Sequence, residues 1–340
     1  MKDRFILDNG YINQAAVLAE SEKNNCPYII EIGARQIGKT YGTLKLLVER
    51  GEKFILMRRT QTEADFICNG AVNPFSGIDP DITIKKATAY TGNIMKDGQQ
   101  IGLVIALSTV SKIRGFYGRE YKDLVYDEFI PERHVLKMKY EAEAFLNAIV
   151  TISGNREIDG EPPLRVWLLA NSNNVDNAIL RGMGLQDKIV RMIDARQELS
   201  IMKERGVMVY MPLNTPVMER RQSDSVTRAA GNEAFLNMAY KNEFAYNDRE
   251  NVRRISAKEL QEYNPVFSVT GVLSVYRHKS KEKIYVTADR NTGFTFSENE
   301  RNLTLIRKRY RPLVNWYTKG GVYFYDIGIK ENFKNLFNLN

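Results

Sequence analysis

Cysteine and histidine are scarce in this sequence, and long hydrophobic runs are missing. The 340 residues include two cysteines, Cys26 and Cys68, so we expect no disulfide framework and a reducing compartment. The two histidines, His134 and His278, are too few and too far apart along the chain to indicate a zinc site. The longest apolar run, Ile101–Leu107, is far shorter than the roughly 20 residues that span a bilayer. Because the sequence also starts without the apolar segment of a secretory signal, we expect a cytoplasmic protein with no membrane partner.

The charge of the chain is unevenly distributed. Hydrophobic residues make up 43% and charged residues 26%, which is ordinary for a globular protein, and the length predicts two domains. Residues 1–214 hold 28 basic and 27 acidic side chains, and residues 215–245 hold four of each. Residues 246–340 hold 17 basic and 10 acidic side chains, nearly the whole net charge of +8. We therefore predict an N-terminal domain (1–214), a helical linker (215–245) and a basic C-terminal domain (246–340) that binds nucleic acid.

The first 200 residues alternate short apolar segments with helical patterns, which predicts an α/β domain with a parallel sheet. The expected strands are 28–32, 54–57, 101–107, 124–126, 166–170 and 207–211, and the expected helices are 40–49, 62–68 and 135–150. A hairpin is expected over 82–98, because Asp97-Gly98 is a strong turn signal. Residues 216–244 have helical spacing. Segments 266–276, 283–288, 303–310 and 321–325 are rich in β-branched and aromatic residues, so they predict a smaller, strand-rich second domain.

A phosphate-binding loop is the strongest motif in the chain. It consists of Gly33, Ala34, Arg35, Gln36, Ile37, Gly38, Lys39 and Thr40, which match G-x-x-x-x-G-K-[ST] between an expected strand and an expected helix. The glycines let the backbone N–H groups point at phosphate oxygens, and the start of the helix adds its positive dipole end. We expect Lys39 to reach the β- and γ-phosphates of ATP and Thr40 to offer its hydroxyl to Mg²⁺.

Two carboxylates follow a second apolar strand. Asp127 would hold Mg²⁺ at the end of the strand, and Glu128 would accept a proton from the attacking water. The phosphate-binding loop and this acidic pair together favour ATP hydrolysis over nucleotide binding alone.

Three further residues are candidate catalytic groups. Asn171 ends the strand 166–170, and in this class of ATPases such a residue often senses the γ-phosphate; its alternative is a turn-forming asparagine. Arg114, in the stretch Ser111–Gly115, and Arg156, in the loop Gly154–Glu157, could each supply an arginine finger to a neighbouring subunit. The alternative for both arginines is ordinary surface solvation.

These motifs resemble the DNA-encapsidation ATPases of small, protein-primed, podovirus-type bacteriophages. Total length agrees, and the resemblance covers about residues 28–175 well. The sequence features shared with that family are the loop Ile32–Thr40, Met57-Arg58-Arg59, Asp127-Glu128-Phe129-Ile130, Asn155-Arg156-Glu157 and the strand that ends in Asn171.

The resemblance implies a motor that uses ATP to drive double-stranded DNA into a prohead. It implies an additional-strand ATPase fold for the first domain, a linker, and a ribonuclease-H-like C-terminal domain without nuclease activity. The implied partners are four other copies in a pentameric ring, the portal of the prohead and, in some relatives, a structural RNA. The implied location is the host cytoplasm, transiently at the portal vertex. Arg114 and the loop around Arg156 match positions where relatives carry trans-acting basic groups.

Two other functions remain open at this stage. A terminase with an active nuclease would need about three clustered carboxylates, and Asp289, Glu298 and Asp326 are the candidates. A nucleotide-switched replication or partition protein that binds DNA without translocating is the second alternative. Glu128 argues against it, since a switch often lacks a water-activating acid.

Overall fold

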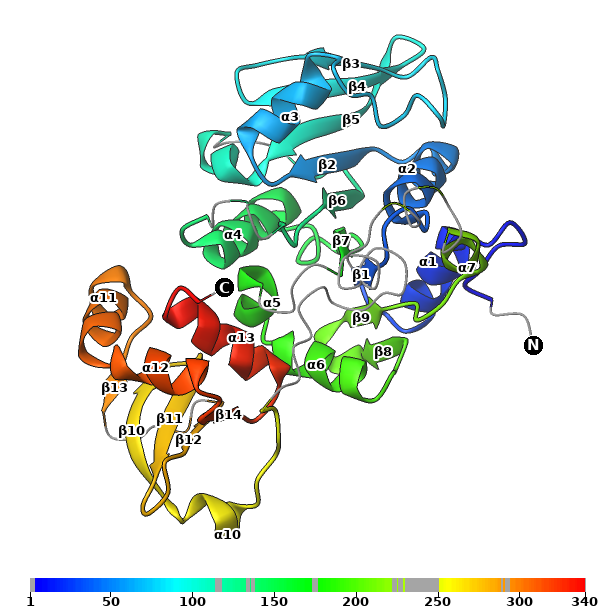
Figure 1. The fold of residues 1–340 in the computed structure, drawn as a ribbon. Helices are drawn as coiled ribbons and strands as arrows, with labels where there is room; N and C mark the ends of the chain where they lie inside the picture. The colour runs from blue at the N-terminus through cyan, green and yellow to red at the C-terminus, as the bar shows by residue number, and fades with distance from the viewer. Residues whose placement is uncertain are drawn as a thin grey trace. The chain divides into compact units, whose positions relative to one another are not determined.

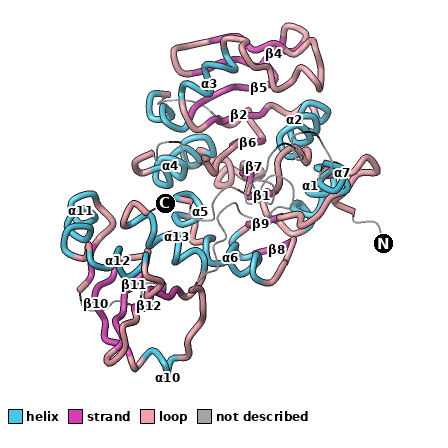
Figure 2. Tube along the Cα trace, viewed as in Figure 1, coloured by secondary structure: helices cyan, strands magenta, loops and turns pink. Residues whose placement is uncertain are grey.

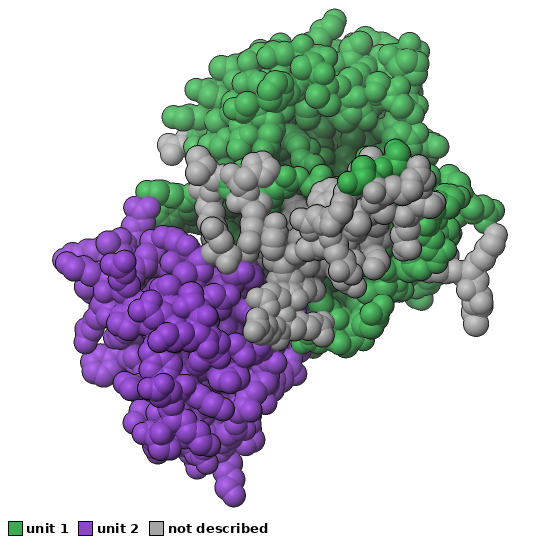
Figure 3. All heavy atoms as spheres, viewed as in Figure 1, with its two compact units in different colours: residues 1–184, 192–246 green, residues 185–191, 247–340 purple. Residues whose placement is uncertain are grey.

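The computed structural model describes residues 4–113, 118–132, 135, 138–172, 177–221, 225, 229, 251–288, 290 and 294–339. The chain divides into two compact units, which Figure 3 draws in different colours. The N-terminal unit comprises residues 1–184 and 192–246, and the C-terminal unit comprises residues 185–191 and 247–340. Most of the expected linker 215–245 lies outside the described residues, so a separate linker stays a prediction. Its described start is the helix α7 (Pro216–Arg221).

The N-terminal unit alternates helices and strands (Figure 1). Its helical elements are α1 (Gln14–Lys23), α2 (Lys39–Arg50), α3 (Gln61–Cys68), the 3₁₀ turn η1 (Leu107–Lys112), α4 (Glu141–Ser153), α5 (Ala178–Gly182), α6 (Gln186–Asp194), η2 (Lys203–Arg205) and α7. Its strands are β1 (Tyr28–Gly33), β2 (Phe54–Arg58), β3 (Thr83–Lys86), β4 (Thr91–Lys96), β5 (Gln99–Ala106), β6 (Asp123–Asp127), β7 (Arg165–Asn171), β8 (Leu199–Met202) and β9 (Val207–Tyr210). Most of α6 lies in the segment 185–191, which belongs to the C-terminal unit, and only its last three residues, 192–194, belong to the N-terminal unit.

Among the described residues, nine strands form one sheet in the order β3-β4-β5-β2-β6-β7-β1-β9-β8. The strands from β5 to β9 pair in parallel, and β7 lies between β1 and β6. This is the predicted additional-strand arrangement, in which the strand before the phosphate loop and the strand that ends in the acids are separated by one other strand. The carboxyl ends of β1, β6 and β7 therefore meet at one edge of the sheet.

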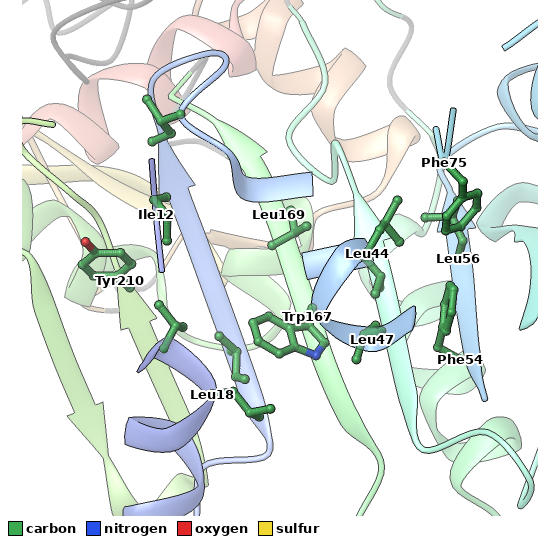
Figure 4. Close-up of a cluster of buried hydrophobic side chains, with 14 of the residues drawn as sticks. Ile12, Leu18, Leu44, Leu47, Phe54, Leu56, Phe75, Trp167, Leu169 and Tyr210 are labelled. Carbon is green, nitrogen blue, oxygen red and sulfur yellow. The ribbon is translucent and has the colours of Figure 1, made fainter. Parts of the chain in front are cut away.

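Local sequence explains these elements. The central strands are continuous apolar runs because helices cover both faces of a parallel sheet. The turn Asp97-Gly98 joins β4 to β5, and both residues have positive φ, as a two-residue hairpin turn requires. On one face of the sheet, Leu44 and Leu47 of α2 pack near Trp167 and Leu169 of β7 in the core of the unit (Figure 4).

The C-terminal unit is smaller and built around antiparallel strand pairs. Figure 2 shows its strands in magenta. Its elements are α10 (Ala257–Leu260), β10 (Tyr263–Val269), β11 (Leu273–His278), β12 (Ile284–Thr287), β13 (Thr295–Phe296), α11 (Glu300–Arg309), α12 (Pro312–Thr318), β14 (Val322–Phe324) and α13 (Ile327–Leu336). The described strands are ordered β13-β10-β11-β12-β14. The strand-rich second domain is thus present.

Two expectations for this unit were wrong. The segment 266–276 is not one strand, because a turn at Gly271, which has positive φ, separates β10 from β11. The segment 303–310 is not a strand but most of α11. There Leu303, Ile306 and Tyr310 recur at helical spacing and pack on the core, and that period outweighs the β-propensity of the residues.

The remaining differences concern helix limits. The helix expected over 135–150 is α4, which begins later, at Glu141, and covers the remaining part of the expected range. The short helices α5 and α12 and the longer α1, α6 and α13 were not predicted. Within the described segments, none of the helices has the length and apolar character that crossing a membrane requires.

Candidate active site

The loop Gly33–Thr40 leads from β1 into α2. Gly38, at its end, has a φ of 96° and precedes the first residue of the helix. A Cβ atom on Gly33 would come within 2.7 Å of Ile37. The two fixed glycines of the motif are therefore required by backbone conformation and by space, which explains them physically.

Lys39 is buried beneath this loop. Its Nζ donates hydrogen bonds to the carbonyl oxygens of Gly33 at 3.1 Å and Ala34 at 2.6 Å, and to Oδ1 of Asn171 at 3.2 Å. Burial lowers the pKa of Lys39 to about 8, and the negative charges of Glu31 and Asp127 oppose that shift. The ammonium group is therefore held, still largely charged at neutral pH, at the edge where the strands end.

The acidic pair at the end of β6 lies beside the phosphate-binding loop. Thr40 Oγ1 donates a hydrogen bond of 2.7 Å to Oδ1 of Asp127 at the end of β6. Burial raises the pKa of Asp127, while the nearby Arg58 and the Thr40 hydroxyl oppose the rise. A hydroxyl and a carboxylate are oxygen ligands of the kind that Mg²⁺ prefers. No group of three or more acidic, histidine or cysteine side chains suited to a metal occurs among the described residues, so phosphate and water oxygens would complete such a site.

Glu128 follows Asp127 in a strained conformation. Its φ is 56°, a left-handed value that is uncommon outside glycine and is found at functional sites. Its side chain is 55% exposed, in contrast with Asp127, and contacts Nη2 of Arg58. The two neighbouring carboxylates thus share the Arg58 guanidinium, but Asp127 is largely buried beside Thr40 while Glu128 is open to solvent.

Arg58 is an active-site residue that sequence reasoning left without a role. It ends β2, which pairs with β6, and its guanidinium contacts both Asp127 and Glu128. Its neighbour Arg59 turns the other way and forms a buried ion pair with Glu141 of α4. The sequence feature that could have indicated a role for Arg58 was the Arg58-Arg59 dipeptide at the end of a predicted strand.

These side chains surround one cavity of about 310 Å³. It is lined by Arg35, Gln36, Gly38, Lys39, Thr40, Tyr41, Asp127, Glu128, Ala170 and Asn171. Arg35 forms an ion pair with Glu132, and Gln36 accepts a hydrogen bond from Arg221 of α7. The structure therefore brings together the predicted loop, both acids and Asn171.

Of the two predicted arginine fingers, Arg156 lies among the described residues, and it does not line this cavity. Arg114 lies outside the described residues. Arg156 is only 1% exposed, and its guanidinium donates to the backbone carbonyls of Gly118, Tyr121, Ile152 and Ser153 at 3.1–3.4 Å. These bonds tie the end of α4 to the segment before β6. A trans-acting role for Arg156 finds no support in this arrangement, because all its donor groups face its own chain.

The candidate nuclease acids are not gathered into a described site either. Asp326 is the N-cap of α13, and its side chain accepts a hydrogen bond of 2.9 Å from the Ile329 amide. This gives Asp326 a structural role. Glu298 is exposed, and Asp289 lies outside the described residues.

A second, larger cavity lies in the C-terminal unit. Its volume is about 660 Å³, and its lining comprises Asn264, Pro265, Val266, Arg277, His278, Lys279, Ser280, Lys281, Glu282, Arg309 and Tyr310. Four of these side chains are cationic and one, Glu282, is acidic. The excess of positive charge around an open hollow suits a polyanion.

Solved structures of phage packaging motors share this fold. The chain aligns with a chain of the bacteriophage Phi-29 viral genome packaging motor assembly at 19% identity and a TM-score of 0.64, covering 96% of this chain and 98% of that one. It aligns with the DNA packaging motor of phage Phi-28 at 16% identity and a TM-score of 0.57, covering 95% and 97%. No curated protein sequence matches the chain. The model of the podovirus DNA encapsidation protein (Gp16) matches residues 10–311, nine-tenths of the length, and the chain belongs to that family.

Proposed function

We propose that this member of the DNA encapsidation family is an ATPase that hydrolyses ATP to translocate double-stranded DNA into a prohead. The observation that carries the proposal is the convergence of Lys39, the Thr40–Asp127 pair and Glu128 on one cavity. Each of these groups has a distinct task in phosphoryl transfer to water.

The chemistry follows from the positions of these side chains. Thr40 and Asp127 would hold Mg²⁺, which would neutralise charge on the β- and γ-phosphates. Lys39 exchanges its contacts with the loop carbonyls for phosphate oxygens. Glu128 is exposed enough to reach a water molecule and accepts its proton as that water attacks. Asn171, the last residue of β7, is already hydrogen-bonded to Lys39 and would sense the γ-phosphate.

Arg58 defines a resting state of this site. Because it contacts both carboxylates, Glu128 is not free to activate water until Arg58 moves. We propose that engagement of DNA or of another subunit releases Arg58 and so couples hydrolysis to translocation.

We assign nucleic-acid contact to the cavity of the C-terminal unit, around Arg277, Lys279, Lys281 and Arg309. The partners that we propose are double-stranded DNA, other copies of the chain in a ring, the portal of the prohead and a packaging RNA. The protein would act in the host cytoplasm and transiently at the portal vertex.

The deciding experiment measures protection of genomic DNA from DNase in purified proheads that are supplied with this protein, ATP and Mg²⁺. We expect protection with the parent chain and none with Lys39→Ala, because that variant lacks the charge that binds phosphate. The matched control is Lys45→Ala, which removes an exposed lysine of the same helix and should package normally. Equal protection by the parent and Lys39→Ala would refute the proposal.

A further inference from the structure

The segment before α1 lies along the outside of the phosphate loop. The backbone N–H of Ile12 donates a hydrogen bond of 3.0 Å to the carbonyl oxygen of Ile37. A Cβ atom on Gly38 would lie 3.3 Å from the side chain of Tyr11. The loop is therefore supported from the N-terminal side as well as by β1 and α2.

Gln14, the first residue of α1, continues this contact into the interior. Its Nε2 donates to Oε2 of Glu31 at 2.9 Å and, in a longer contact, to the carbonyl oxygen of Lys39 at 3.4 Å. A Cβ atom on Gly42 would lie only 2.9 Å from Cγ of Gln14, so the side chain packs directly against the backbone of α2. One side chain thus joins α1, β1 and the first turn of α2.

Glu31 is an unusual residue at the centre of a buried strand. It is 0% exposed, and burial raises its pKa to about 7. Within the described part of the chain, neither Oε1 of Glu31 nor Oε1 of Gln14 has a hydrogen-bond partner. Buried polar atoms without partners cost stability, and apolar side chains of similar size would fill this position at lower cost. A costly polar pair beside Lys39 is expected where function requires it.

We propose that Gln14 and Glu31 are positioning residues of the ATP site. Glu31 orients the amide of Gln14, and that amide fixes the first turn of α2, so that Lys39 and the loop N–H groups are held where the phosphates bind. Neither residue lines the cavity, so each acts through the loop and not on ATP. This inference rests on the ATPase function proposed above.

Two single variants test the hydrogen bonds. Gln14→Met keeps the length of the side chain but removes the amide, and Glu31→Gln keeps its shape but removes the charge that accepts the Gln14 donor. We expect each to raise the KM for ATP about tenfold, the effect of losing a buried hydrogen bond to a charged group, with a much smaller change in kcat. We expect the Tm of Glu31→Gln to stay level or rise, because a buried ionisable group is removed. Gln14→Met should lower the Tm modestly, because it leaves the buried Glu31 carboxyl without its donor.

A double-mutant cycle tests the packing. In the parent, Gly42→Ala should raise the KM for ATP because the new methyl group collides with Gln14, although alanine is the better helix former. In a Gln14→Ala chain the collision partner is gone. Gly42→Ala should then add no further rise in KM, so the two effects should be clearly non-additive.

The control is Gln99→Met, a change at an exposed position of β5 that should alter neither KM nor Tm. An unchanged KM in both Gln14→Met and Glu31→Gln would overturn the inference. So would a parallel loss of Tm and ATP affinity in every variant, which would mean that the pair only holds the fold.

Calorimetric Kd values for Mg²⁺-ATP accompany the kinetics. If the parent binds ATP but does not hydrolyse it, the proposed function fails while the Kd still tests the pair; if the parent binds no ATP, both fail.

Discussion

Nη1 of Arg58 donates a hydrogen bond of 2.6 Å to Oδ2 of Asp127, the residue that we expect to hold Mg²⁺. A guanidinium therefore contacts one oxygen of this carboxylate, while Thr40 contacts the other. A Mg²⁺ ion bound to Asp127 would have to compete with the arginine for the same acid. This competition leads to the first prediction.

Arg58→Gln should lower the Mg²⁺ concentration that gives half-maximal ATP turnover, because a competing positive charge is removed from Asp127. A magnesium titration of initial rates measures the effect, with Lys45→Gln as the control at an exposed position. A half-maximal concentration that is unchanged or higher would show that Arg58 does not compete with the metal.

Glu128→Gln should retain ATP binding but lose nearly all hydrolysis. The amide has a similar shape but is a poor base, so the loss is expected to be on the order of 10²-fold or more in kcat. Calorimetric binding and steady-state turnover separate the two properties. Turnover at the parent rate would mean that another group accepts the proton from water.

Glu31 should make the stability of the chain depend on pH. Its pKa is raised in the folded chain from an ordinary 4.5 to about 7, so its contribution is fully present below about pH 4.5 and is lost as the pH rises through 7. From pH 5 to pH 8 the parent should lose on the order of 2 kcal/mol relative to Glu31→Gln. Denaturant unfolding of both chains at the two pH values measures this. Parallel pH profiles would contradict the buried, protonated carboxyl.

Arg156→Ala should destabilise the fold by about 3 kcal/mol, because it removes four buried or partly buried hydrogen bonds between the guanidinium and backbone carbonyls. The Tm and the turnover should therefore fall together. Mixing Arg156→Ala with Lys39→Ala chains should restore no activity. Normal stability together with rescue on mixing would instead establish the arginine as a finger that acts on a neighbour.

Lys279→Gln combined with Lys281→Gln should weaken binding of duplex DNA by the full chain. Both lysines are exposed around the C-terminal cavity, and each lost phosphate contact should reduce the slope of log affinity against log salt by about 0.9. The control pair, Lys45→Gln with Lys85→Gln, removes the same charge from the N-terminal unit. Equal salt dependence in the two double variants would remove the cavity from the DNA-binding surface.

The parts of the site that are local in sequence were predictable. The loop Gly33–Thr40 and the pair Asp127–Glu128 are short motifs whose spacing is set by one turn and one strand end. Arg58 was not assigned, because it lies 69 residues from Asp127 and meets it only through the pairing of β2 with β6. The burial of Arg156 was not predicted for a related reason, since nothing in the neighbouring sequence indicates that the carbonyls of a distant segment surround it.

The sequence by itself determined the α/β alternation, the phosphate loop and the acids, because these depend on hydrophobic period and on a few residues with fixed backbone needs. Only the tertiary structure decided which side chains share a site. The insertion of β7 between β1 and β6 places Asn171 against Lys39, and α1 places Gln14 on Glu31. Strand order and helix packing are settled by the burial of whole faces. Contacts between residues far apart in the chain are a consequence of that burial, and no local pattern encodes them.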